Sequence, residues 1–96
     1  MNIEITSRHF TLSVELKDLI NVKISKLDKY NVGLSRCRVI LSKGNPSEER
    51  VEIIAHSKGH EFVAHDDSST FEKSLVSSVK RLSIQLKKHH DKMVGH

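Results

Sequence analysis

The stretch RVEIIAHSKGHEFVAHDD, residues 50–67, decides the fold because it predicts two strands and the turn that joins them. Apolar and polar residues alternate on both sides of Lys58-Gly59, a pair typical of a tight turn in which glycine adopts a positive φ. With this turn, one register opposes apolar residues to apolar ones and each histidine to a carboxylate. The predicted pairs are Ala55–Phe62, Ile53–Ala64, Ile54–Val63, His56–Glu61 and Glu52–His65.

The segments around this hairpin predict two more strands and two helices. Alternation indicates strands at NIEITS (residues 2–7) and SRCRVILS (residues 35–42). Between them, Ser13 can cap a helix that ends near Tyr30, and a last helix begins at Asp67 or at one of residues 68–70. Their apolar stripes are Leu16, Ile20, Ile24 and Leu27 in the first helix, and Phe71, Leu75, Val79, Leu82 and Leu86 in the last.

The resulting order β-α-β-β-β-α predicts an α+β fold in one domain spanning residues 1–96. A crossover helix makes the first two strands parallel neighbours, and the remaining strands follow as an antiparallel meander. We therefore expect a four-stranded mixed sheet with both helices packed on one face.

Composition restricts the setting and the chemistry. The chain is 36% hydrophobic and 29% charged, as in globular proteins, and it has no apolar run of about 20 residues that could span a membrane. The single Cys37 excludes an intramolecular disulfide and a multi-cysteine zinc site, and its place in a strand predicts a buried thiol. The first ten residues alternate, unlike a signal peptide, so we expect a cytoplasmic protein with no membrane partner.

The net charge of +4 is concentrated near the end of the chain. Residues 71–93 hold six lysines and arginines against Glu72 and Asp91, and the rest of the sequence is balanced. These cations lie opposite the apolar stripe, with Ile84 in their midst, and lysines of the first helix add to them, so a polyanionic partner is expected. The predicted nucleic-acid-binding residues are Lys23, Lys26 and Lys29 on the first helix, and Lys73, Lys80, Arg81, Lys87 and Lys88 on the last.

Metal binding and catalysis have little support. The adjacent pair His89-His90 points about 100° apart on a helix and cannot ligate one ion as an i, i+4 pair would. The sequence has no nucleophile elbow and no glycine-rich phosphate loop. We expect no enzyme, no metal, no cofactor and no small-molecule substrate.

Three segments together resemble the ribosome hibernation promoting factor family, which includes the ribosome-associated inhibitor protein Y. The opening of residues 1–30 has an alternating strand, a capped amphipathic helix and the K-x-x-K-L ending at Lys23, Lys26 and Leu27. HEFVAHDD is similar to the family's last strand, and RLSIQLKKHHDK to its final helix with lysines after a leucine-glutamine-leucine core. The family commonly has an arginine where this sequence has Ile84.

The resemblance implies a hibernation factor that binds the small ribosomal subunit and its ribosomal RNA in the messenger RNA channel. Such a protein excludes messenger and transfer RNA and shuts off translation in resting or stressed cells, in some cases with a separate ribosome-pairing factor. A chain of this length would be a short form of the family. By position, the implied RNA contacts are Lys23, Lys26, Lys29, Lys80, Arg81, Lys87 and Lys88.

Two other readings of the residues stay open. A general double-stranded RNA-binding module also has a strand meander followed by a helix. A protein-interaction adaptor could instead use the sheet face away from the helices, where Ile40, Ile54 and Val63 are expected to be exposed. Competition by free duplex RNA would favour the first alternative, and binding that is insensitive to salt would favour the second.

Overall fold

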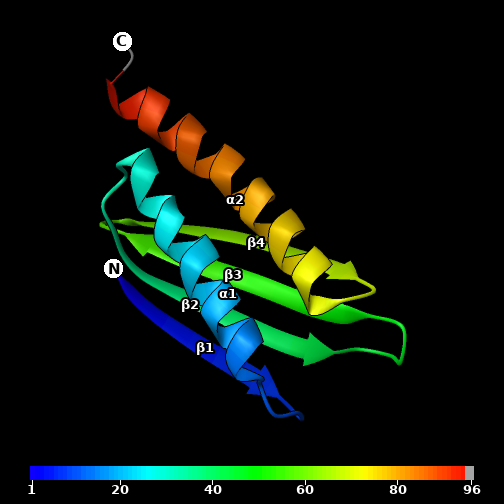
Figure 1. Ribbon diagram of the computed structural model, residues 1–96. Helices are drawn as coiled ribbons and strands as arrows, with labels where there is room; N and C mark the ends of the chain where they lie inside the picture. Colours follow the sequence, from blue (N-terminus) through cyan, green and yellow to red (C-terminus); the bar gives the residue numbers. More distant parts are fainter. Residues whose placement is uncertain (95–96) are drawn as a thin grey trace.

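The computed structural model describes residues 1–94 (Figure 1) and has the predicted order β-α-β-β-β-α. A short 3-10 helix, η1, continues the first α-helix. The elements are β1 (Asn2–Arg8), α1 (Val14–Ser25), η1 (Lys26–Tyr30), β2 (Leu34–Lys43), β3 (Glu49–Ser57), β4 (His60–Ser68) and α2 (Phe71–Val94).

The strands form one sheet in the order β1-β2-β3-β4, with β1 parallel to β2 and the other neighbours antiparallel. This confirms the predicted mixed sheet. Lys58 and Gly59 alone connect β3 to β4, and Gly59 has a φ of +77°. All five predicted cross-strand pairs are present, including Ala55 opposite Phe62. The hairpin is therefore fixed by local alternation and one permissive glycine.

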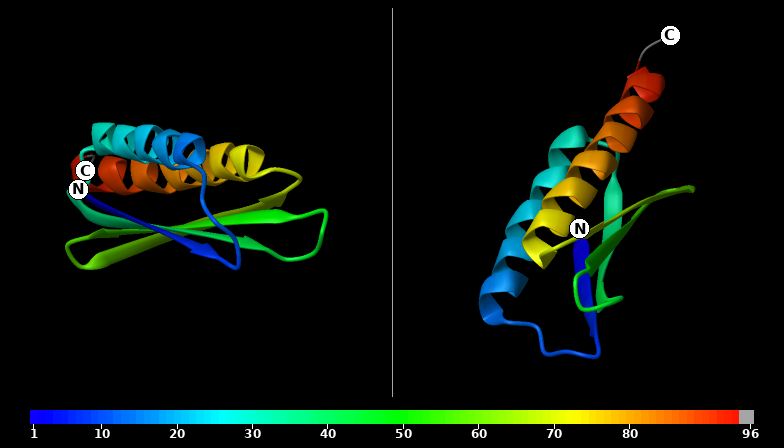
Figure 2. Two further views of the ribbon diagram at one scale, coloured as in Figure 1. Left: turned by 60° about the horizontal axis from the view of Figure 1, so that its bottom comes forward. Right: turned by 90° about the vertical axis from the view of Figure 1, so that its right-hand side faces the viewer.

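Both helices cover the same face of the sheet and leave the other face open (Figure 2). They also run in the same direction (Figure 1), because α1 follows β1 and α2 follows β4, and these two strands point the same way. Each helix begins at a side-chain cap. The Ser13 hydroxyl accepts a hydrogen bond from the Leu16 amide at 3.2 Å, and the Thr70 hydroxyl accepts one from the Lys73 amide at 3.2 Å.

The hydrophobic core lies between the helices and the sheet, and both predicted apolar stripes point into it. Its largest fully buried side chains are Ile20, Ile24, Leu27, Leu41, Ile53, Leu75, Leu82 and Leu86. Cys37 is fully buried in β2, as predicted. Burial, together with the nearby charge of Asp28, raises the pKa of its thiol to about 11, so it is a packing residue rather than a nucleophile.

Two buried serines bring α2 close to β3. Ser78 donates its hydroxyl to the Val51 carbonyl at 3.1 Å, and Ser74 donates to the Glu49 carbonyl while accepting from the Ser68 amide. Both side chains are inaccessible to solvent. The hydrophobic stripe did not include them because serine is polar, yet small hydrogen-bonded residues allow a helix to approach a strand closely.

The structure differs from the sequence-based expectation in two places. The first helical segment ends at Tyr30 as predicted, but it is α-helical only to Ser25; η1 completes it, and Asn31, with a left-handed φ of 53°, terminates it. Ile40 was expected to be exposed on the open sheet face, but only 8% of it is accessible. It lies in an inner strand between Thr6 and Glu52, and neighbours on both sides cover it.

We predict that Gly59→Ala lowers the free energy of unfolding by about 1 kcal/mol, because a Cβ disfavours the left-handed region. A Cβ at this position would meet no atom within 4 Å, so the cost comes from the backbone alone. Gly44 offers the matched control, since its φ is not in that region and its Cβ would make an ordinary contact with Glu48 at 3.8 Å. In urea unfolding, equal stability losses in the two alanine variants would contradict this explanation.

Candidate nucleic-acid interface

The parallel helices bring lysines from distant parts of the chain to one end of the molecule. The first turns of α1 and α2 are neighbours, since Leu16 and Phe71 line the same depression between them. Lys23 lies nine residues beyond the first residue of α1, and Lys80 lies nine residues beyond the first residue of α2. With a rise of about 1.5 Å per residue, both are about 13 Å from where their helices begin.

We call the six predicted RNA-binding lysines at and beyond this level the cationic end; Lys92, in the last turn of α2, lies further on and is not one of them. Its members are Lys23, Lys26, Lys29, Lys80, Lys87 and Lys88. Within residues 1–94, none of them forms an ion pair closer than 4 Å with a carboxylate. Of the helical acids, Glu15 and Glu72 lie in first turns and Asp18 lies in the second turn of α1. Asp28 in η1 and Asp91 in α2 lie among the lysines, which outnumber them, so the positive charge is in excess at this end.

Tyr30 lies beside the α1 part of this surface. Its ring is partly buried against the core, and the Lys29 ammonium is 5.3 Å from the ring centroid. This distance permits a cation–π contact. On α2, Lys80, Ile84 and Lys87 point within about 60° of one another and away from the core stripe. Because α2 contacts both α1 and η1, these lysines lie on a helix that packs against the segments bearing Lys23, Lys26 and Lys29.

Arg81, predicted as an RNA contact, also binds the edge of the sheet, and its side chain stays 57% exposed. Its guanidinium lies 3.3 Å from the Asp66 carboxylate and donates to the His65 carbonyl at 2.6 Å. One turn further on, Gln85 donates to the Val63 carbonyl at 2.8 Å. These bonds satisfy outward carbonyls of β4 that could otherwise pair with another strand. The charge of Arg81 is thus partly compensated within the protein.

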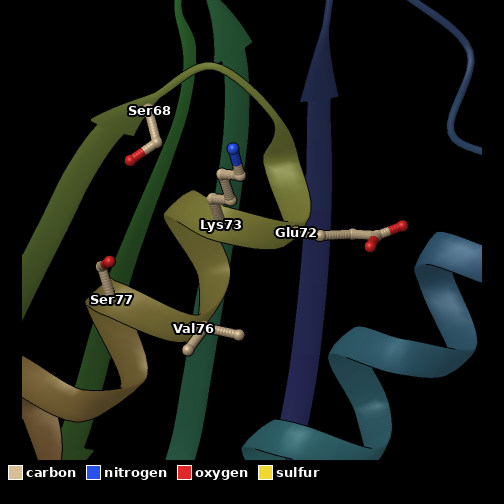
Figure 3. Close-up of a pocket in the computed structure, with 5 residues that line it drawn as sticks. All are labelled: Ser68, Glu72, Lys73, Val76 and Ser77. Carbon is tan, nitrogen blue, oxygen red and sulfur yellow. The ribbon is translucent and has the colours of Figure 1, made fainter.

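Lys73 lies apart from the other predicted lysines, in the first turn of α2, and its ammonium is 3.4 Å from the Ser69 hydroxyl. It lines a shallow depression with Ser68, Glu72, Val76 and Ser77. Figure 3 shows that these five side chains point in different directions rather than toward a common centre. The depression offers no arrangement of acid, base and nucleophile.

Two histidines of the hairpin, His56 and His65, lie close to acids, but only one of them is nearest its predicted partner. His56 lies 3.7 Å from Glu61, its predicted partner. His65 is opposite Glu52 in register, but its nearest acid is Asp67 at 3.9 Å. No group of three potential metal-ligating side chains occurs in the part of the chain that the structure describes. Across the same residues, no helix is long and apolar enough to cross a membrane.

The cationic end of α2 is held against the tip of the hairpin. The His89 ring lies 4.3 Å from that of His60 and 5.2 Å from that of Phe62, measured between centroids. His60 and Phe62 point to the helix face of β4, so these edge-on contacts anchor the fifth turn of α2. Lys87 and Lys88, which immediately precede His89, are therefore displayed on a packed helix.

Comparisons with known proteins agree with this geometry. The N-terminal domain of Protein Y from Thermus thermophilus is 25% identical, with a TM-score of 0.84 over 93% of this chain and 99% of that one. A ribosomal subunit interface protein from Coxiella burnetii is 21% identical and shares the fold, with a TM-score of 0.85 over 93% and 97% of the two chains. A comparison with curated protein sequences gives no significant match. Residues 3–94 match a model described as Sigma 54 modulation protein / S30EA ribosomal protein, and the chain therefore belongs to that family.

Proposed function

We propose that this protein is a hibernation factor that binds the small ribosomal subunit in the messenger RNA channel and excludes messenger and transfer RNA. Membership of the S30EA ribosomal protein family makes it a ribosome-associated protein that modulates translation. Its similarity to Protein Y and to a ribosomal subunit interface protein supports the more specific proposal. Its place of action is then the cytoplasm of resting or stressed cells, where ribosomes are kept inactive.

The observation that carries the proposal is the cationic end, where six lysines from two helices gather without acidic partners among the described residues. Phosphates of ribosomal RNA can neutralise these charges and release counterions. The mechanism is steric: a folded body occupies an RNA-lined channel through which other RNAs must pass. Binding alone produces the effect, and no bond is made or broken.

The structure offers little of the apolar surface that a protein-interaction adaptor would need. That alternative required an apolar patch on the open sheet face, where Val63 is exposed as predicted, at 41%, but Ile40 is buried and Ile54 is only partly exposed. Ion pairs cover much of the rest of that face, including Arg36 with Glu4 and Arg50 with Asp67. Such a face resembles a solvated surface more closely than a hydrophobic interface.

We predict that affinity for purified small subunits falls about 250- to 1,000-fold between 50 and 200 mM salt. This follows if the cationic end neutralises about five phosphates, for which the logarithmic slope is roughly −4 to −5. Sedimentation of the protein with small subunits at several salt concentrations measures the slope. Affinity that is independent of salt would contradict an electrostatic interface.

The same sedimentation assay separates the proposal from a general duplex RNA binder. An excess of free double-stranded RNA should displace little of the bound protein, because the protein is proposed to recognise the shape of the channel as well as its charge. Reporter translation with purified components should stop once the protein is equimolar with ribosomes. Free duplex that competes as well as ribosomes do would favour the general RNA-binding function.

A further inference from the structure

Ile84 is an aliphatic residue surrounded by positive charge. On a helix, the surface neighbours of a residue lie three and four positions away on either side. For Ile84 these four neighbours are Lys80, Arg81, Lys87 and Lys88, and all of them are cations. Half of the residue, 52%, is accessible to solvent in the free protein.

The fold itself gives little reason for an isoleucine at this position. Single exposed aliphatic residues are common and usually need no explanation. Ile84, however, faces away from the core stripe, and its β-branched side chain is a weaker helix former than leucine or lysine. An interface that approaches the four cations must also cover the apolar side chain between them.

We propose that Ile84 is an apolar contact for RNA, which packs against ribose or base carbons between phosphates bound by its lysine neighbours. This inference rests on the proposed function. Lys80 and Lys88 are eight residues apart, about 12 Å along the helix, and Ile84 lies midway between them. Where the lysines bind phosphates, water is excluded around Ile84, and burial of its exposed half contributes to affinity.

The positive charge around Ile84 indicates which class of molecule covers it. A protein that covered Ile84 would need a matching cluster of acids around an apolar pocket, whereas RNA provides anionic phosphates and uncharged sugar carbons at every nucleotide. Apolar side chains that contact nucleic acid beside basic ones have a precedent in minor-groove DNA-binding proteins, which insert residues such as isoleucine between base steps. The occupant proposed for Ile84 is therefore ribosomal RNA.

The first test compares Ile84→Ala with Val14→Ala in binding to small subunits across salt concentrations. Val14 is the matched control, because it is 70% exposed in the first turn of α1, far from the cationic end. We expect Ile84→Ala to weaken binding about tenfold, which corresponds to roughly 55 Å² of lost apolar burial, without changing the salt slope. Val14→Ala should bind as the wild type does.

The two variants also separate the failure of this inference from that of the proposed function. If the wild type binds with a steep salt dependence and Ile84→Ala binds equally well, Ile84 is not a contact and the inference alone is wrong. If the wild type does not bind ribosomes, the proposed function fails and the inference fails with it. Thermal unfolding should show that both alanine variants remain folded at the temperature of the assay.

The second test identifies the class of molecule that covers Ile84. An aliphatic diazirine amino acid is placed at position 84, or at position 14 as the control, and the complex with small subunits is irradiated. Crosslinks from position 84 to ribosomal RNA are expected, with few from position 14. Crosslinks from position 84 to ribosomal proteins alone would overturn the assignment to RNA.

Discussion

Replacing Lys80, Lys87 and Lys88 with glutamate is expected to abolish association with ribosomes. Each lysine lies on the cationic end, is exposed, and forms no ion pair within the described residues 1–94. The substitutions remove three phosphate contacts and add three negative charges that repel the RNA. A loss of at least about a thousandfold in affinity at moderate salt follows from the steep dependence on neutralised phosphates.

The same variant should remain folded, because the three side chains point away from the core and glutamate is a good helix former. Arg81 is left unchanged on purpose, since its bonds to Asp66 and to the His65 carbonyl support the edge of the sheet. Sedimentation with small subunits measures association, and circular dichroism during heating measures the fold. Persistent co-migration of the triple variant with small subunits would defeat the assignment of these lysines.

A control with the same change in net charge tests whether position matters. Arg8 and Lys43 end the neighbouring strands β1 and β2, and Lys17 is in the first turn of α1, so all three lie toward the end where the helices begin, outside the cationic end. Their replacement by glutamate should weaken binding far less, because most of its effect is screened beyond the Debye length of about 10 Å. If the two triple variants lose equal affinity, net charge rather than the cationic end determines binding.

Ser78→Leu is expected to have the largest effect on stability, with a loss of about 3 kcal/mol or more in the free energy of unfolding. The serine is fully buried where α2 approaches β3 and donates to the Val51 carbonyl. Leucine adds three carbons to a filled space and removes that hydrogen bond, so the helix must move away from the sheet. Such a loss is a large fraction of the stability of a small domain.

Two variants isolate the cause of this loss. Ser77→Leu makes the same chemical change one position earlier, where the side chain is partly exposed, and should be nearly neutral. Ser78→Ala removes only the hydrogen bond and should cost about 1 kcal/mol. Urea unfolding measures all three variants. Equal stability of the two leucine variants would show that close packing at Ser78 is not required.

The hairpin and the two apolar stripes could be predicted because each is determined by residues that are close together in the sequence. The register of β3 with β4 follows from alternation around Gly59, since a shift by one residue would move every apolar side chain to the wrong face. Similarly, Ile20 and Leu82 were predicted to be buried from helical spacing alone, and both are. These features depend on residues close together in the sequence.

Contacts between elements could not be predicted in the same way. Arg81 has the spacing of an outward cation, and only the position of α2 over β4 brings it to Asp66. Serine is polar, which favours exposed positions. Ser74 and Ser78 are nevertheless buried because α2 packs closely against the sheet at these positions. Ile40 is covered by side chains on two neighbouring strands. Each outcome depends on rotations and distances between elements that periodicity does not specify.

The parallel course of α1 and α2 also affects how the protein meets its target. Acids and lysines nearly balance where the helices begin, whereas lysines predominate further along, so the protein has an electric dipole moment along its helices. A polyanionic wall attracts one pole and repels the other, which exerts a torque on the molecule before any atoms touch. With ribosomal RNA as the proposed target, this torque would turn the cationic end toward it during diffusion and make more of the collisions productive.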